Sequence, residues 1–132
     1  ATEIIESERE EIRSHVAELR NLFYEKCMNE RDGIRLIGPN LDDRHVSNLS
    51  ICFGGYEAED LISTMQPKLA VSTGSACTSG IPEPSHVLSA IGIVSKDINS
   101  VIRFSFGKYQ KRDDIIDAIE ILLEVLEKVD NR

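Results

Sequence analysis

A single cysteine stands among small residues in the second half of the chain. Cys77 lies within residues 72–80, where every other residue is serine, threonine, glycine or alanine. Glycine and hydroxyl residues favour turns and loops, and small neighbours leave the sulfur sterically open. Because thiolates are strong nucleophiles, this segment predicts chemistry on the Cys77 sulfur. A free cysteine is also a common small core residue, so burial in the core is the alternative interpretation.

An arginine further along the chain occupies the polar face of an expected strand. Ile102, Phe104 and Phe106 alternate with Arg103 and Ser105, and side chains of a strand point to opposite faces with a period of two. An arginine fixed on a strand can bind a carboxylate through two parallel hydrogen bonds. The pattern predicts a carboxylate-binding group, and an edge-strand arginine paired with an acidic helix is the alternative.

Together these segments resemble the C-terminal part of the cysteine desulfurases that depend on pyridoxal phosphate (PLP). The resemblance is to the branch of class V aminotransferases that serves iron–sulfur cluster assembly and nitrogenase maturation. Its motifs appear in the family's order. They are residues 70–79 around Cys77, residues 82–88 and 90–92, residues 102–107 around Arg103 and, more weakly, residues 49–53 and 55–61.

The resemblance implies a role for each of the two residues. Cys77 matches the cysteine that attacks the sulfur of L-cysteine and becomes a persulfide while L-alanine is released. Arg103 matches the residue that holds the substrate carboxylate. The resemblance further implies PLP as the cofactor of the parent enzyme, a homodimeric parent, and a sulfur-acceptor or scaffold protein as partner.

The chain lacks one feature that the family carries. The family binds PLP covalently through a lysine that follows a histidine in a larger preceding domain, but here each of the three histidines is followed by valine. No glycine-rich turn that opens a helix is present to hold a phosphate. We therefore expect residues 1–132 to be a single C-terminal domain without the PLP-binding large domain. This fragment is expected to be inactive by itself.

Two smaller departures concern local structure. Thr73 stands where the family more often has serine, which keeps the hydroxyl group. Residues 108–112 stand where the family tends to have threonines that cap the last helix. We expect a weaker helix cap there and no effect on the chemistry.

Length and composition restrict the class of protein. The chain has 132 residues, a net charge of −8 and 41% hydrophobic residues, which fits one globular domain. A basic stripe with interleaved aromatic residues is missing, which disfavours nucleic-acid binding, and no apolar run has membrane length. Three cysteines without metal-ligand spacing favour a reducing compartment. We expect a cytoplasmic protein that binds neither nucleic acid nor membrane.

The apolar pattern predicts an α+β fold, a two-layer sandwich with a small, mostly antiparallel sheet and flanking helices. The resemblance implies the same fold, the small domain of fold-type I PLP enzymes. Helices are expected at residues 6–29, 57–65, 84–91 and 113–129, and Gly92 is expected to end the third in the left-handed conformation. Strands are expected at residues 34–37, 46–53, 69–71 and 101–107.

Three other residues have types that could take part in chemistry. Cys27 falls on the apolar stripe of the first helix and is expected in the core. Cys52 faces away from the apolar residues of its strand, where it is either half exposed or covered by a helix. His86 lies in the first turn of the third helix. By residue type it is a candidate general base for Cys77, and a surface or partner-facing role is the alternative.

Two alternatives to the desulfurase hypothesis stay open at this point. The chain could be a stand-alone sulfur-relay module that carries a persulfide on Cys77 without catalysis, in which case Arg103 has no substrate carboxylate to bind. It could also be a relative similar to selenocysteine lyase, because the residues that handle the cofactor and most of the side-chain pocket lie outside the small domain.

Overall fold

The computed structural model describes residues 2–73 and 86–132. Its strands form an antiparallel sheet in the order β1-β2-β4-β3. The strands are β1 (Ile34–Leu36), β2 (Asn48–Phe53), β3 (Ser72–Thr73) and β4 (Val101–Ser105). The helices are α1 (Thr2–Glu30), α2 (Ala58–Met65), α3 (His86–Ala90), α4 (Ser95–Ile98) and α5 (Arg112–Asp130), with a 3-10 turn η1 (Leu41–Asp43).

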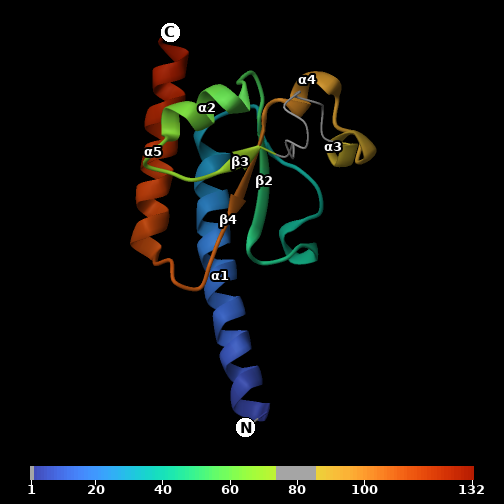
Figure 1. The fold of residues 1–132 in the computed structure, drawn as a ribbon, viewed down its shortest axis with the longest axis vertical. Helices are drawn as coiled ribbons and strands as arrows, with labels where there is room; N and C mark the ends of the chain where they lie inside the picture. The colour runs from blue at the N-terminus through green and yellow to red at the C-terminus, as the bar shows by residue number, and fades with distance from the viewer. Residues whose placement is uncertain (1, 74–85) are drawn as a thin grey trace.

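One face of the sheet, which we term the core face, packs against α1, α2 and α5 (Figure 1). Leu49, Ile51, Phe53, Ile102 and Phe104 point to this face and are buried. The expected alternation therefore holds in both central strands, because these five residues face α1, α2 and α5 and the residues between them face the other way. The predicted α+β sandwich with a small antiparallel sheet is confirmed.

The first helix extends well beyond the sheet. Its stripe is buried at Val16, Leu19, Phe23 and Cys27, as its spacing predicts. The stripe continues toward the N-terminus at Ile12, but that side chain is 40% exposed because the start of α1 projects past the rest of the domain (Figure 1).

Local signals at the ends of two helices have different outcomes. Gly92 has φ +82° just after α3, so the predicted left-handed residue is confirmed there. The expected weaker cap of α5 is found in part: the Lys111 side chain at the N-cap makes no capping hydrogen bond, but the Lys111 backbone N–H donates a hydrogen bond of 2.7 Å to Asp114 Oδ2. The aspartate three residues into the helix thus makes one half of a capping box, and the half that a threonine side chain would supply is missing.

The third strand lies later in the chain than its sequence predicts. A strand was expected at residues 69–71, but β3 comprises Ser72 and Thr73. The difference matters for function, since it pairs the start of the 72–80 segment directly with the strand that carries Arg103.

A polar contact joins the ends of three helices at one pole of the domain. The Tyr56 hydroxyl, just before α2, donates to Asp130 Oδ1 of α5 at 2.6 Å. It also accepts a hydrogen bond of 2.6 Å from Arg31, just after α1, and Arg31 forms an ion pair with Asp130. Hydrogen bonds from Tyr56 and from Arg31 lower the pKa of the Asp130 carboxyl.

Replacing Tyr56 with phenylalanine is expected to destabilise the domain by no more than about 1 kcal/mol, because water screens partly exposed hydrogen bonds. A lowered carboxyl pKa contributes stability above its unfolded value of about 4, and this contribution is lost as the pH falls through the folded value. The difference in free energy of unfolding between wild type and Tyr56→Phe, measured with urea, should therefore be present at pH 7 and shrink below about pH 4. A difference that does not change with pH would contradict the proposed coupling to Asp130.

Candidate functional site

Cys77 lies outside the residues that the structure describes, so its predicted role is not tested by geometry. The described chain before it ends in β3. Cys77 follows Thr73, the last residue of β3, by four positions. Four residues of extended chain span at most about 14 Å. The last described residue before it, Thr73, pairs with Ile102 of β4.

Arg103 lies on β4, directly across from Ser72 of β3 on one side and Ser50 of β2 on the other. Its side chain is exposed and points to the face opposite Ile102 and Phe104, which we term the outer face. Because β4 lies between β2 and β3, the edge-strand alternative does not describe its position. Neither ion pair found among the described residues involves Arg103. The guanidinium is thus exposed and forms no ion pair with any residue that the structure describes.

The other half of the outer face is covered by α3 and α4. Cys52 and Val101, paired between β2 and β4, are buried there together with Ile37 and Leu88. An ion pair of 2.6 Å between Arg35 of β1 and Asp97 of α4 fixes α4 to the sheet. This small cluster fixes the chain soon after it re-enters the described part at His86. Both ends of the segment that contains Cys77 are therefore attached to the same sheet.

The two described cysteines are poor nucleophiles. Cys27 is 1% exposed and Cys52 is fully buried. Burial raises the pKa of the Cys27 thiol to about 12, and burial likewise raises the pKa of Cys52. A thiol at such a site stays protonated and therefore unreactive near neutral pH. The prediction that Cys27 belongs to the core is confirmed, and the covered alternative holds for Cys52.

The three histidines occupy separate elements. His15 of α1 lies 2.8 Å from the Gln110 carbonyl through its Nε2, and His45 contacts the Ser47 hydroxyl at 2.7 Å. Both have structural hydrogen bonds. His86 is exposed at the start of α3, so its proposed contact with Cys77 stays a prediction.

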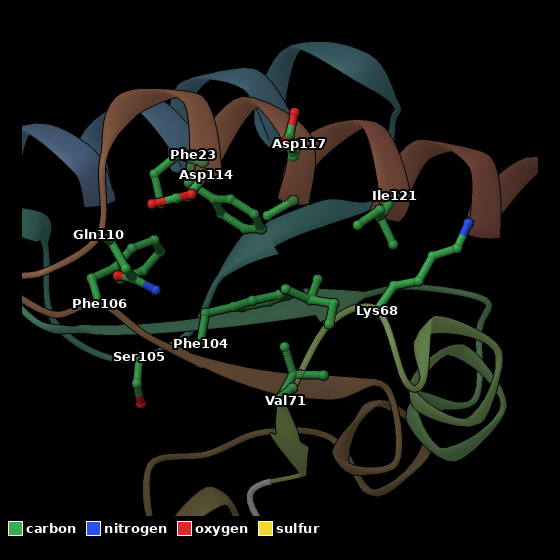
Figure 2. Close-up of a pocket in the computed structure, with 14 residues that line it drawn as sticks. Phe23, Lys68, Val71, Phe104, Ser105, Phe106, Gln110, Asp114, Asp117 and Ile121 are labelled. Carbon is green, nitrogen blue, oxygen red and sulfur yellow. The ribbon is translucent and has the colours of Figure 1, made fainter.

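A pocket of about 430 Å³ opens beside β4 on the core face. Its apolar floor includes Phe23, Phe104 and Phe106, while Lys68 and residues of α5 form its rim (Figure 2). Two of its polar side chains already accept hydrogen bonds from the backbone. Asp114 accepts one from the Lys111 N–H and Gln110 accepts one from the Gly107 N–H, both at 2.7 Å. The pocket lies on the face opposite Arg103 and is separate from the candidate site.

Two other features of the described part of the chain bear on its function. No group of three or more histidine, cysteine, aspartate or glutamate residues there has a metal-binding arrangement. No described helix combines the length and the apolar character needed to cross a membrane.

The sequence is similar to known enzymes over nearly its whole length. Residues 1–118 match the family model described as aminotransferase class-V. The cysteine desulfurase IscS of Photobacterium profundum is 37% identical over 129 residues, which cover 98% of this chain and 31% of that protein. The mitochondrial cysteine desulfurase of Arabidopsis thaliana is 37% identical over 98 residues, 74% of this chain and 21% of that protein. The chain thus spans less than a third of the length of these relatives.

Solved structures share the fold. A NifS-like protein superposes with a TM-score of 0.77 at 25% sequence identity, covering 95% of this chain and 31% of that chain. The Escherichia coli cysteine desulfurase CsdA superposes with a TM-score of 0.62 over 88% of this chain and 25% of that chain, at 17% identity. The second similarity supports the fold alone.

Proposed function

Because this chain belongs to the class-V aminotransferase family, we propose that it is the C-terminal small domain of a PLP-dependent cysteine desulfurase. The intact enzyme takes sulfur from L-cysteine as a persulfide on Cys77 and releases L-alanine, for iron–sulfur cluster or thio-cofactor synthesis. The observation that carries the proposal is the pairing of Ser72 with Arg103. This pairing supports the proposal, because Ser72 lies five residues before the proposed nucleophile and directly beside the proposed carboxylate-binding arginine. The names of the curated relatives favour cysteine over selenocysteine as substrate.

The proposed roles follow from the chemistry of the two side chains. Arg103 binds the substrate carboxylate through its planar pair of N–H donors, which fixes the amino acid relative to the sheet. The Cys77 thiolate then attacks the substrate sulfur. A sulfur–sulfur bond forms, the carbon–sulfur bond breaks, and its electron pair stays with the carbon fragment, which takes up a proton to become alanine.

PLP is proposed for the intact enzyme and is held by residues outside this chain, since no lysine here follows a histidine. When bound, PLP withdraws electrons from the amino acid and weakens its carbon–sulfur bond. The PLP site and the proposed substrate-binding residue Arg103 must therefore lie next to each other, at the boundary between this domain and the cofactor-binding part of the enzyme.

We also propose the partners and location that accompany this activity. The intact enzyme is a cytoplasmic homodimer that passes persulfide sulfur from Cys77 to an acceptor or scaffold protein. A segment of small residues supports this transfer, because it gives the sulfur steric access to a second protein. The unpaired Cys27 and Cys52 are in keeping with a reducing compartment.

The test replaces Arg103 with alanine in the intact enzyme. We expect the KM for cysteine to rise about 10²-fold, since a charge-assisted bidentate contact is lost, while Arg103→Lys recovers part of this loss. Alanine formation from cysteine is the measurement. Arg112→Ala, which removes an exposed arginine at the start of α5, is the charge-matched control and should leave the KM unchanged.

Two results would overturn the proposal in different ways. If the intact wild-type protein with PLP forms no alanine from cysteine, the chain is not part of a desulfurase. If it loads Cys77 with sulfur equally well with and without Arg103, the domain is a sulfur relay whose arginine has no substrate to hold.

A further inference from the structure

Arg103 is the centre of a row of three polar residues that crosses three strands. Ser50 of β2 and Ser72 of β3 lie directly opposite it in the sheet, so all three side chains point to the outer face. Both serines are half-buried, whereas Arg103 is exposed. The next pair on this side of the sheet, Cys52 and Val101, is buried under α3 and α4. The row therefore borders the covered half of the outer face.

The two serines do not stand equally close to the arginine. The Ser50 carbonyl accepts a hydrogen bond of 2.9 Å from Ile37 N on its other side. Its pairing with Arg103 is therefore of the non-hydrogen-bonded kind, in which side chains approach most closely, with Cα atoms about 4.5 Å apart. Arg103 directs its own backbone groups toward Ser72. That pair is of the hydrogen-bonded kind, with Cα atoms about 5.5 Å apart.

Side-chain length decides what the serines can contact. A serine hydroxyl sits one carbon from the backbone, whereas the guanidinium of Arg103 ends a long stem. A carboxylate bound at the far end of the guanidinium is too distant for either serine hydroxyl to contact. The aliphatic stem of Arg103 and the guanidinium N–H groups nearest to it lie closer to the sheet, where the hydroxyls can reach them. A bidentate carboxylate uses two of the five guanidinium donors, which leaves others to donate toward the sheet.

We propose that Ser50 and Ser72 are positioning residues for Arg103. When the substrate carboxylate is bound, their hydroxyl oxygens accept hydrogen bonds from the guanidinium and hold it in the orientation that binds the carboxylate. Ser50 makes the larger contribution, because its pairing brings it closer. This inference rests on the proposed function and extends it to two residues that act through the arginine.

The experiment replaces Ser50 with alanine in the intact enzyme and measures alanine formation from cysteine. We expect the KM for cysteine to rise about three- to tenfold with kcat unchanged, a smaller rise for Ser72→Ala, and recovery in Ser50→Thr, which keeps the hydroxyl. Competitive inhibition by alanine and by alaninamide gives a second readout. Only the carboxylate ligand should bind Ser50→Ala more weakly, so the preference for alanine over alaninamide should fall by the same factor.

Two variants show whether the serine acts through the arginine. In an Arg103→Ala background, Ser50→Ala should have no further effect, since the group that it positions is gone. Ser105→Ala is the matched control: it removes an exposed serine from the same face of the same strand, one pleat away from Arg103. Its KM should equal that of the wild type.

The outcomes separate this inference from the function on which it rests. Equal weakening of alanine and alaninamide by Ser50→Ala, or additive effects of the Ser50 and Arg103 changes, would overturn the positioning role while the enzyme remains a desulfurase. A wild-type enzyme that forms no alanine from cysteine would overturn the proposed function, and the positioning role with it.

Discussion

Replacing Cys77 with serine in the intact enzyme is expected to lower alanine formation from cysteine by at least about 10³-fold. A hydroxyl oxygen is far less nucleophilic near neutral pH than a thiolate, and it cannot form the sulfur–sulfur bond that completes the transfer. Mass spectrometry of the wild-type enzyme after brief exposure to cysteine should show one added sulfur atom on the peptide that contains Cys77. The Cys77→Ser enzyme should show no added sulfur on this peptide.

The two described cysteines provide the control. Cys52 is fully buried and burial raises its thiol pKa, so Cys52→Ala should still form alanine and still load sulfur on Cys77. Cysteine binding should persist in Cys77→Ser, because Arg103 is unchanged. Full alanine formation by Cys77→Ser, or added sulfur on Cys52, would refute Cys77 as the persulfide carrier.

The sequence predicts the helices and the central strands of this domain well, because their signals are local. Two long stripes at helical spacing become α1 and α5, and the alternation around Arg103 becomes β4 with its predicted faces. The predicted position of β3 is wrong by two residues at its end and three at its start. A two-residue strand has almost no pattern of its own, and its position is set by pairing with β4, which lies about thirty residues later.

The candidate site is predicted in part. Residue types identify Cys77 and Arg103, but only the sheet register shows that Ser50 and Ser72 flank the arginine. The alternation of residues 48–53 already places Ser50 on the polar face, yet nothing in that segment says which strand it meets. Register is fixed by packing of the whole sheet. The sequence leaves the burial of Cys52 undecided for a similar reason, because α3 and α4 reach it from a distant part of the chain.

The core that holds β4 in place is expected to depend strongly on Phe23 of α1. Its side chain is 1% exposed, and its ring centroid lies 4.7 Å from that of Phe104 and 5.7 Å from that of Phe106. Replacing Phe23 with alanine removes both ring contacts and leaves a cavity next to the existing pocket beside β4. We expect the free energy of unfolding of the 132-residue chain to fall by about 3–5 kcal/mol, measured by urea denaturation.

Ile12→Ala is the matched control on the same stripe of the same helix. Ile12 is 40% exposed, and an exposed apolar side chain contributes little to folding, so the change should stay within about 0.5 kcal/mol. Because Arg103 directly precedes Phe104 on β4, a looser core should also let the arginine move. Phe23→Ala in the intact enzyme should therefore raise the KM for cysteine as well. If Phe23→Ala lowers the free energy of unfolding no more than Ile12→Ala does, the ring contacts of Phe23 with Phe104 and Phe106 do not hold β4 in place.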